Sequence, residues 1–223
     1  MAGRLFLDII DPWINWDWLS NHIPLVFTSL VAHAELTVIA VAVALVISLP
    51  LGVVAQRQRL LRGPILTING IFYTIPSIAL FALLIPYTGL SILTGEIGLV
   101  LYALLILIRN IVVGLDAVPA DVLDAADGMG YRPFARLIRV ELPLALPAIF
   151  AGIRIATVTT IGLVTITAVI GLDSLGQLIL NGLINNFHTP LVVGTVLSVV
   201  LAFVADMALA LGQRVAVPWA RPA

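Results

Sequence analysis

The stretch LTVIAVAVALVISLPLGVVA, residues 36–55, carries no charged side chain and is followed by the polar cluster Gln56-Arg57-Gln58-Arg59. The hydrocarbon core of a bilayer is about 30 Å thick, and a helix of roughly 20 apolar residues crosses it. Backbone groups in that core must be satisfied within the segment, which favours a helix. The stretch therefore predicts a transmembrane helix.

The composition of the whole chain agrees with this prediction. Of the 223 residues, 61% are hydrophobic and 10% are charged, and the mean hydropathy is +1.15. Soluble domains have about 45–50% apolar and roughly 25% charged residues. We therefore predict an all-α polytopic membrane protein with about five transmembrane helices. Little chain is left over, which excludes an extramembrane catalytic or nucleotide-binding domain.

Cysteine and lysine are both absent from the chain, and their absence excludes several kinds of site. The chain has no cysteine, so it can hold no disulfide and no thiolate metal site. All 11 basic residues are arginines, so a phosphate-binding loop with its lysine and a Schiff-base lysine are both excluded. If ATP drives this protein, another subunit binds it. The net charge of −1 gives no basic face for nucleic acid.

Further apolar runs divide the rest of the chain. We predict crossings at residues 65–86, 97–115, 148–172 and 190–213, within a transmembrane domain over residues 35–215 that leaves a short tail at 216–223. Residues 1–34 contain acids and three tryptophans, which predicts an interfacial segment that is not a signal peptide, with a partly disordered leader as the alternative.

Arginine positions predict the orientation. The segments 57–62, 132–139 and 214–221 contain arginine, whereas the loops 87–96 and 173–189 contain no basic residue. Short loops rich in basic residues stay in the cytoplasm. Five crossings then place the N-terminus outside and the C-terminus in the cytoplasm.

The polar loop at residues 116–147 is the most informative cytoplasmic segment. Pro119 suits the start of a helix, and Gly128 and Gly130 permit a sharp left-handed exit. A second helical piece should begin near Arg132 and end before Pro143. This predicts a helix, a tight turn and another helix, although a solvated amphipathic loop without a special role is the alternative.

The loop resembles the cytoplasmic motif of ABC-importer permeases, Glu-Ala-Ala-x3-Gly-x9-Ile-x-Leu-Pro. Its spacing matches throughout, with an aspartate in place of the first glutamate and a valine in place of the isoleucine. The resemblance implies a type I ABC importer permease fold and a coupling helix that docks on an ATP-binding subunit. The implied ATPase-coupling residues are Asp124, Ala125, Ala126, Gly130, Val140, Leu142 and Pro143.

A narrower resemblance concerns the substrate. Ala-Glu-Leu-Thr at 34–37, Thr-Ile-Pro-Ser-Ile-Ala-Leu at 74–80, Ala-Val-Ile-Gly at 168–171 and Ser-Leu-Gly at 174–176 resemble permeases of the glycine betaine, choline and carnitine osmoprotectant systems. This implies import of a quaternary ammonium compound. Methionine permeases have a similar size and topology, so an amino-acid permease is the alternative.

The same resemblance implies the assembly. We expect two cytoplasmic ATP-binding subunits that carry ATP and Mg, a second permease (identical or homologous), an extracytoplasmic substrate-binding protein, and a bacterial or archaeal cytoplasmic membrane. The chain itself should be no enzyme and hold no cofactor or metal. A small ion-coupled transporter or channel is the rival from another class, but it leaves the loop motif unexplained.

Several membrane residues are candidates for a pathway or gate. Pro76 removes a backbone hydrogen bond and predicts a kink, either at a gate or for packing alone. Hydroxyls can line a polar path or bond to carbonyls three or four residues back. An intramembrane charge needs a partner, so we expect Asp206 to pair with Arg109 or Arg154. The pathway candidates are Tyr73, Thr74, Pro76, Thr157, Thr160 and Thr165.

Overall fold

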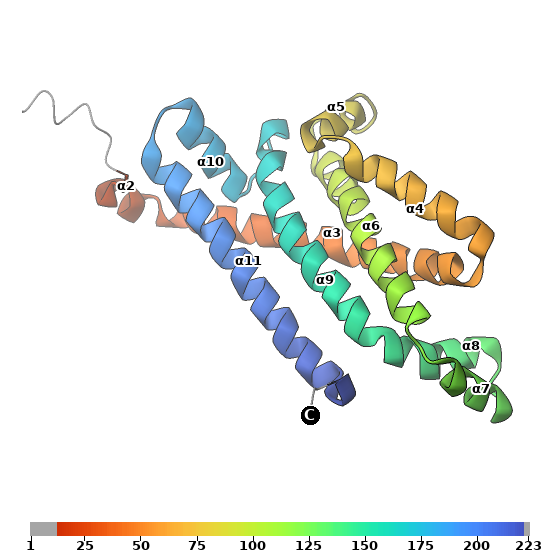
Figure 1. The fold of residues 1–223 in the computed structure, drawn as a ribbon. Coiled ribbons are helices and arrows are strands. Elements are labelled where there is room, and N and C mark those ends of the chain that lie inside the picture. The colour runs from red at the N-terminus through yellow and green to blue at the C-terminus, as the bar shows by residue number, and fades with distance from the viewer. Residues whose placement is uncertain (1–12, 221–223) are drawn as a thin grey trace, which may run out of the picture.

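The computed structural model describes residues 13–220, and these form helices and connecting turns without any strand. Four helical stretches are long and apolar enough to cross a membrane: α3 (Ile23–Arg57), α6 (Ile92–Asp116), the composite run Pro133–Ile170, and α11 (His188–Ala216). A fifth crossing is possible if α4 (Arg59–Thr74) and α5 (Ser77–Thr88), bent by 99°, form one broken span. The prediction of an all-α polytopic membrane protein is confirmed (Figure 1).

Shorter elements complete the chain. The composite run consists of α8 (Pro133–Arg136), a π-helical turn η1 (Leu137–Glu141), α9 (Leu142–Val164) and a 3-10 turn η2 (Thr165–Ile170). The other elements are α2 (Trp16–Asn21), α7 (Ala120–Gly128), α10 (Leu175–Ile184) and η3 (Pro218–Ala220).

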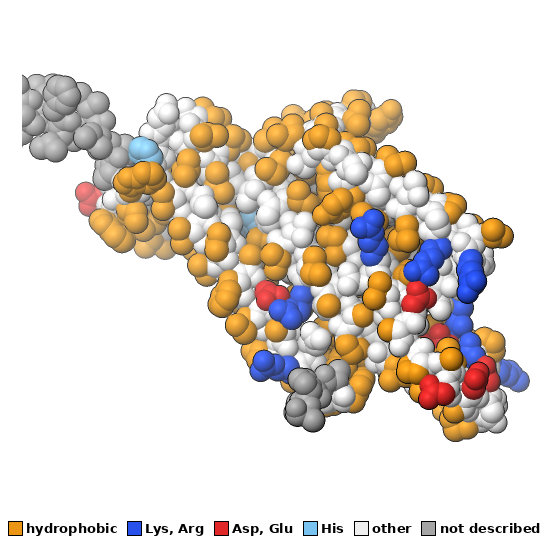
Figure 2. Space-filling view, in the orientation of Figure 1, with side chains coloured by type: hydrophobic (Ala, Val, Ile, Leu, Met, Phe, Trp, Pro, Cys, Tyr) orange, Lys and Arg blue, Asp and Glu red, His pale blue; other side chains and the backbone are white. Residues whose placement is uncertain are grey.

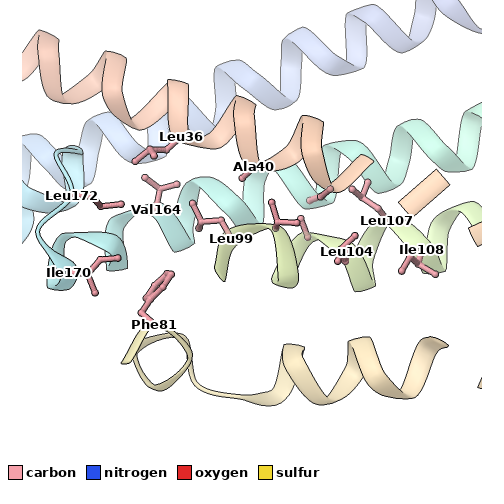
Figure 3. Close-up of a cluster of buried hydrophobic side chains, with 14 of the residues drawn as sticks. Leu36, Ala40, Phe81, Leu99, Leu104, Leu107, Ile108, Val164, Ile170 and Leu172 are labelled. Carbon is pink, nitrogen blue, oxygen red and sulfur yellow. The ribbon is translucent and has the colours of Figure 1, made fainter. Parts of the chain in front are cut away.

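Helix α6 lies at the centre of the bundle and packs against α3 on one side and α9 on the other. Leu99, Leu107 and Ile108 on α6 are almost fully buried, and Phe81 of α5 reaches into the same cluster (Figure 3). Small residues let these helices approach closely. A Cβ atom at Gly114 of α6 would lie 2.9 Å from the carbonyl oxygen of Ala145 on α9.

The first long helix begins earlier than predicted. α3 starts at Ile23 and has 35 residues, so the predicted boundary at residue 34 falls inside it. Pro24 in the first turn and the uncharged residues after it explain the early start. A helix of about 52 Å exceeds the hydrocarbon thickness, which requires tilt or protrusion. Residues 1–12 of the predicted interfacial segment lie outside the described residues.

The second crossing breaks at Pro76, a larger change than the predicted kink. The hydroxyl of Tyr102 on α6 donates a hydrogen bond to the carbonyl oxygen of Ile75 at the break. This bond satisfies a carbonyl that the interrupted helix leaves without a backbone donor. α4 also begins at Arg59, so residues predicted as loop belong to the helix.

The second helical piece of the polar loop does not end before Pro143, and that prediction is wrong. The chain continues through η1 into α9, with the N–H of Leu142 donating to the carbonyl of Leu137. Pro143 has no backbone N–H to donate. It lies in the first turn of α9, and the wide π-helical turn η1 before it connects α8 to α9 without a break. The predicted outer loop 173–189 also contains a helix, α10, which packs on α11.

Candidate coupling loop and transport pathway

The predicted coupling helix is α7, which lies at the end of the molecule opposite α5 and α10 (Figure 1). Its exit is left-handed at Gly130, where φ is +80°, as the sequence predicts. Gly128 remains part of α7. The N–H of Tyr131 donates to the carbonyl of Ala126 over 3.2 Å and closes the turn.

The two alanines of the motif do not share one environment. Asp124 and Ala125 are exposed, whereas Ala126 is only 1% exposed. Adjacent helical residues point about 100° apart, so Ala126 packs within the protein while Ala125 can face a partner. The motif residues Val140, Leu142 and Pro143 are half-buried.

Sequence reasoning missed two apolar side chains on the outside of this loop. Met129 is 69% exposed and Phe134 is 76% exposed. They flank the glycine turn at an end of the molecule that also carries charged groups. The sequence indicates them as large apolar residues in an otherwise polar segment. Exposed apolar side chains of this size are typical of a docking surface.

A charge network fixes the loop to the membrane helices. The carboxylate of Glu141 is 2% exposed and accepts hydrogen bonds from Arg57 Nη2 at 2.6 Å and Arg136 Nε at 2.9 Å. Arg136 also donates to Asp127 on α7. The network therefore joins the end of α3, the start of the α9 run and the coupling helix, and none of its members was among the predicted site residues.

The break between α4 and α5 contains the predicted gate residues. The ring of Tyr73 lies edge-on to Tyr102, with centroids 5.8 Å apart. The hydroxyl of Thr74 donates to the carbonyl of Ile71 over 2.8 Å. Tyr73 and Thr74 also line an open hollow of about 570 Å³ together with Arg109 of α6.

The threonines of the α9 run mostly bond to their own helix. Thr157 donates to the carbonyl of Ile153 over 2.8 Å, and Thr165 donates to Gly162 over 2.7 Å. Thr160 is 1% exposed. This geometry agrees with local bonding, and it gives these three hydroxyls no common open surface.

The predicted intramembrane ion pair forms between α9 and α11. Arg154 Nε lies 2.7 Å from Asp206 Oδ1, and Arg154 Nη2 lies 2.8 Å from Asp206 Oδ2. About a third of each side chain is exposed, and both border a hollow of about 520 Å³. Arg109 takes no part in the pair and instead borders the hollow beside α4.

Charge separates the two ends of the molecule. In Figure 2 the arginine side chains lie in the middle of the bundle and toward the end that carries α7 and the C-terminal end of α11, and none is visible over α5 or α10. Among residues 13–220, no group of three or more His, Asp or Glu side chains is placed to hold a metal ion. The geometry is that of a helical bundle with most of its charged side chains away from α5 and α10.

Comparison with known proteins identifies the family. Residues 45–215 match the family described as "Binding-protein-dependent transport system inner membrane component". The chain belongs to this family. It is therefore a permease subunit of an ABC importer, and the predicted recognition is confirmed.

Two relatives show the similarity along most of the permease. The osmoprotectant import permease protein OsmW of Salmonella typhimurium is 40% identical over 191 residues, covering 83% of this chain and 89% of that protein. The choline transport system permease protein OpuBB of Bacillus subtilis is 36% identical over 188 residues, covering 83% and 86% respectively.

A solved structure shows the same fold. The structure described as inward-facing conformations of the MetNI methionine ABC transporter matches with a TM-score of 0.81 at 24% identity, covering 88% of this chain and 98% of that chain. The permease thus has the predicted type I ABC importer permease fold.

Proposed function

We propose that the permease imports a quaternary ammonium osmoprotectant such as glycine betaine, choline or carnitine. The observation that carries this proposal is the 40% identity to an osmoprotectant import permease over 83% of the chain. The exposed face of Tyr73 beside the broken span is consistent with such a cargo, because an aromatic face attracts a permanent cation.

In this proposal, ATP hydrolysis on two separate cytoplasmic subunits, which carry the ATP and Mg, drives transport. Asp124, Ala125, Met129 and Phe134 are exposed on the coupling loop and would contact one ATPase. The network around Glu141 would then transmit the movement to α3 and α9, because it joins the loop to both. An extracytoplasmic binding protein would deliver the substrate.

A second permease, identical or homologous, would complete the pathway. Arg109 and the pair of Arg154 with Asp206 are partly exposed along helices that cross the membrane. Charged groups in contact with lipid cost several kcal/mol. These surfaces would therefore face the second permease or a water-filled path, and lipid would cover the apolar remainder.

The charge asymmetry supports the orientation. The arginine-rich end with α7 would lie in the cytoplasm and the ends of α5 and α10 outside, in the cytoplasmic membrane of a bacterium or archaeon. A reporter enzyme fused after Arg214 should then be cytoplasmic, and one inserted near Gly89 should be outside.

Reconstitution in liposomes tests the substrate. Liposomes that contain the permease, its ATPase, the second permease and the binding protein should take up labelled glycine betaine. Uptake should require ATP on the side of the membrane where the ATPase lies. Unlabelled choline or carnitine should compete for uptake. Transport of labelled methionine alone would overturn the substrate, and flux driven by an ion gradient without ATP would overturn the whole assignment.

A further inference from the structure

An aliphatic groove runs between α3 and α6, away from the hollows that carry arginine. Its volume is about 620 Å³. Ile39, Val43 and Ile47 of α3 line one wall at four-residue spacing, and Val100, Leu101 and Leu104 of α6 contribute to the other. Four-residue spacing places side chains in one row along a helix, so the groove follows the helices.

One carboxylate interrupts this aliphatic surface. Glu96 of α6 lines the groove, and both of its carboxylate oxygens are buried without a hydrogen-bond partner among residues 13–220. Glu35 of α3 is exposed and lies four residues before Ile39, in the same row. No arginine lines the groove, so a cation that pairs with Glu96 has to come from outside the chain.

The depth of Glu96 points to a lipid headgroup. Glu96 lies four residues after the start of α6 at Ile92, which is about 6 Å along the helix. With the proposed orientation, that distance lies near the outer end of the crossing, and the aliphatic groove continues from it toward the bilayer centre. A molecule with a cationic head and a long apolar chain matches this arrangement.

The two carboxylate oxygens need hydrogen-bond donors, and this requirement decides between headgroups. A primary ammonium has three N–H donors, whereas a quaternary ammonium has none. We propose that the groove is a binding site for a phospholipid with a primary ammonium headgroup, phosphatidylethanolamine. Its ammonium donates to Glu96 once the carboxylate turns toward the groove, and one acyl chain lies along Ile39, Val43 and Ile47.

A lipid fits this face better than a second permease does. The hollows beside Arg109 and beside Arg154 contain charged side chains, which are unfavourable in contact with lipid. The α3–α6 groove is aliphatic except for one carboxylate. A quaternary ammonium substrate would leave the carboxylate oxygens of Glu96 without donors, so the groove is no substrate site.

Native mass spectrometry of the assembled transporter tests the proposal. The probes are dioleoyl phosphatidylethanolamine and dioleoyl phosphatidylcholine, which differ only in the methylation of the ammonium. We expect phosphatidylethanolamine to bind about tenfold more tightly, since charge-assisted hydrogen bonds depend on its N–H donors. Equal binding of the two lipids would overturn the proposal.

Three variants assign the binding to the groove. Glu96→Ile removes the carboxylate without creating a buried polar group and should abolish the tenfold preference. Val43→Trp fills the groove and should weaken both lipids. Asp173→Asn removes an exposed carboxylate that lies outside the groove and should change neither. If Glu96→Ile keeps the preference for phosphatidylethanolamine, the site is contradicted. The site is also contradicted if lipid binds the isolated permease but not the assembled transporter.

Discussion

Replacing Glu141 with glutamine should loosen the coupling loop from the membrane helices. The carboxylate is 2% exposed and accepts from both Arg57 and Arg136. Both guanidinium groups donate to the same oxygen, Oε1, so the oxygen of the replacing amide can still accept, but the negative charge is lost. Arg57 and Arg136 would then lie together, with only Asp127, the other partner of Arg136, to offset their positive charge.

The exposure of each partner sets the magnitude. Removing one member of a buried ion pair costs roughly 3–5 kcal/mol. The side chain of Arg57 is 34% exposed, so water recovers part of its solvation, and we expect about 2–4 kcal/mol for the docking of the loop. Local opening would become roughly 30- to 700-fold more frequent.

Hydrogen exchange of the α7 amides measures this opening, and ATP-driven uptake measures its consequence. Asp116→Asn is the matched control, because it breaks the ion pair of Asp116 with Arg62 at the same end of the molecule. Those side chains are 38% and 42% exposed, so the loss should be about 0–1 kcal/mol. Equal exchange of α7 in the two variants would refute the reasoning.

Three further substitutions test individual contacts. Gly130→Ala should destabilise the loop by about 1–2 kcal/mol through the backbone conformation alone, since no atom lies within 4 Å of the added Cβ. Hydrogen exchange of the turn amides measures this loss, and an unchanged exchange rate would contradict the left-handed turn. Tyr102→Phe removes the hydroxyl that donates to Ile75 and should lower the free energy of unfolding by about 1–3 kcal/mol. Thermal unfolding in detergent measures this change, and an unchanged unfolding temperature would contradict the hydrogen bond. Arg154→Leu leaves Asp206 without its partner and should lower the unfolding temperature in detergent, because an unpaired charge along a membrane helix is unfavourable. The double replacement of both residues by leucine should restore most of the loss. A double variant as unstable as the sum of both single variants would show that the pair is not coupled.

The apolar runs and the turn chemistry were predictable because they depend on neighbours in the sequence. Residues 36–55 are apolar enough to reveal a crossing on their own, and Gly130 stands where a helix must end in a left-handed turn. The burial of Ala126 was also within reach, because two adjacent helical residues cannot face the same partner. A stricter use of helical phase would have separated it from Ala125.

Contacts between distant segments were not predictable in this way. Glu141 and Arg57 are 84 positions apart, and nothing near either residue in the sequence indicates the other. His33 is fully buried and its Nε2 lies 3.0 Å from the carbonyl oxygen of Ile161, 128 positions away. These pairs depend on how α3, α6 and α9 pack together, which a single sequence does not encode locally.

The choice between two arginines shows the same limit. Arg109 and Arg154 lie at comparable depth on their helices, and both were candidates for Asp206. α11 packs directly on α9, so the arginine of α9 reaches the carboxylate. The rotation of each helix about its axis decides which arginine pairs with Asp206. The positions of charges in the sequence do not contain this information.

Site-directed cross-linking tests the central claim, that this loop docks on an ATPase subunit. The chain contains no cysteine, so Ala125→Cys supplies a single attachment point for a photoactivatable maleimide on the exposed side of α7. The account predicts a covalent adduct with the ATPase in the assembled transporter, and none from Leu90→Cys at the opposite end. Adducts with the ATPase from Leu90→Cys, and none from Ala125→Cys, would contradict it.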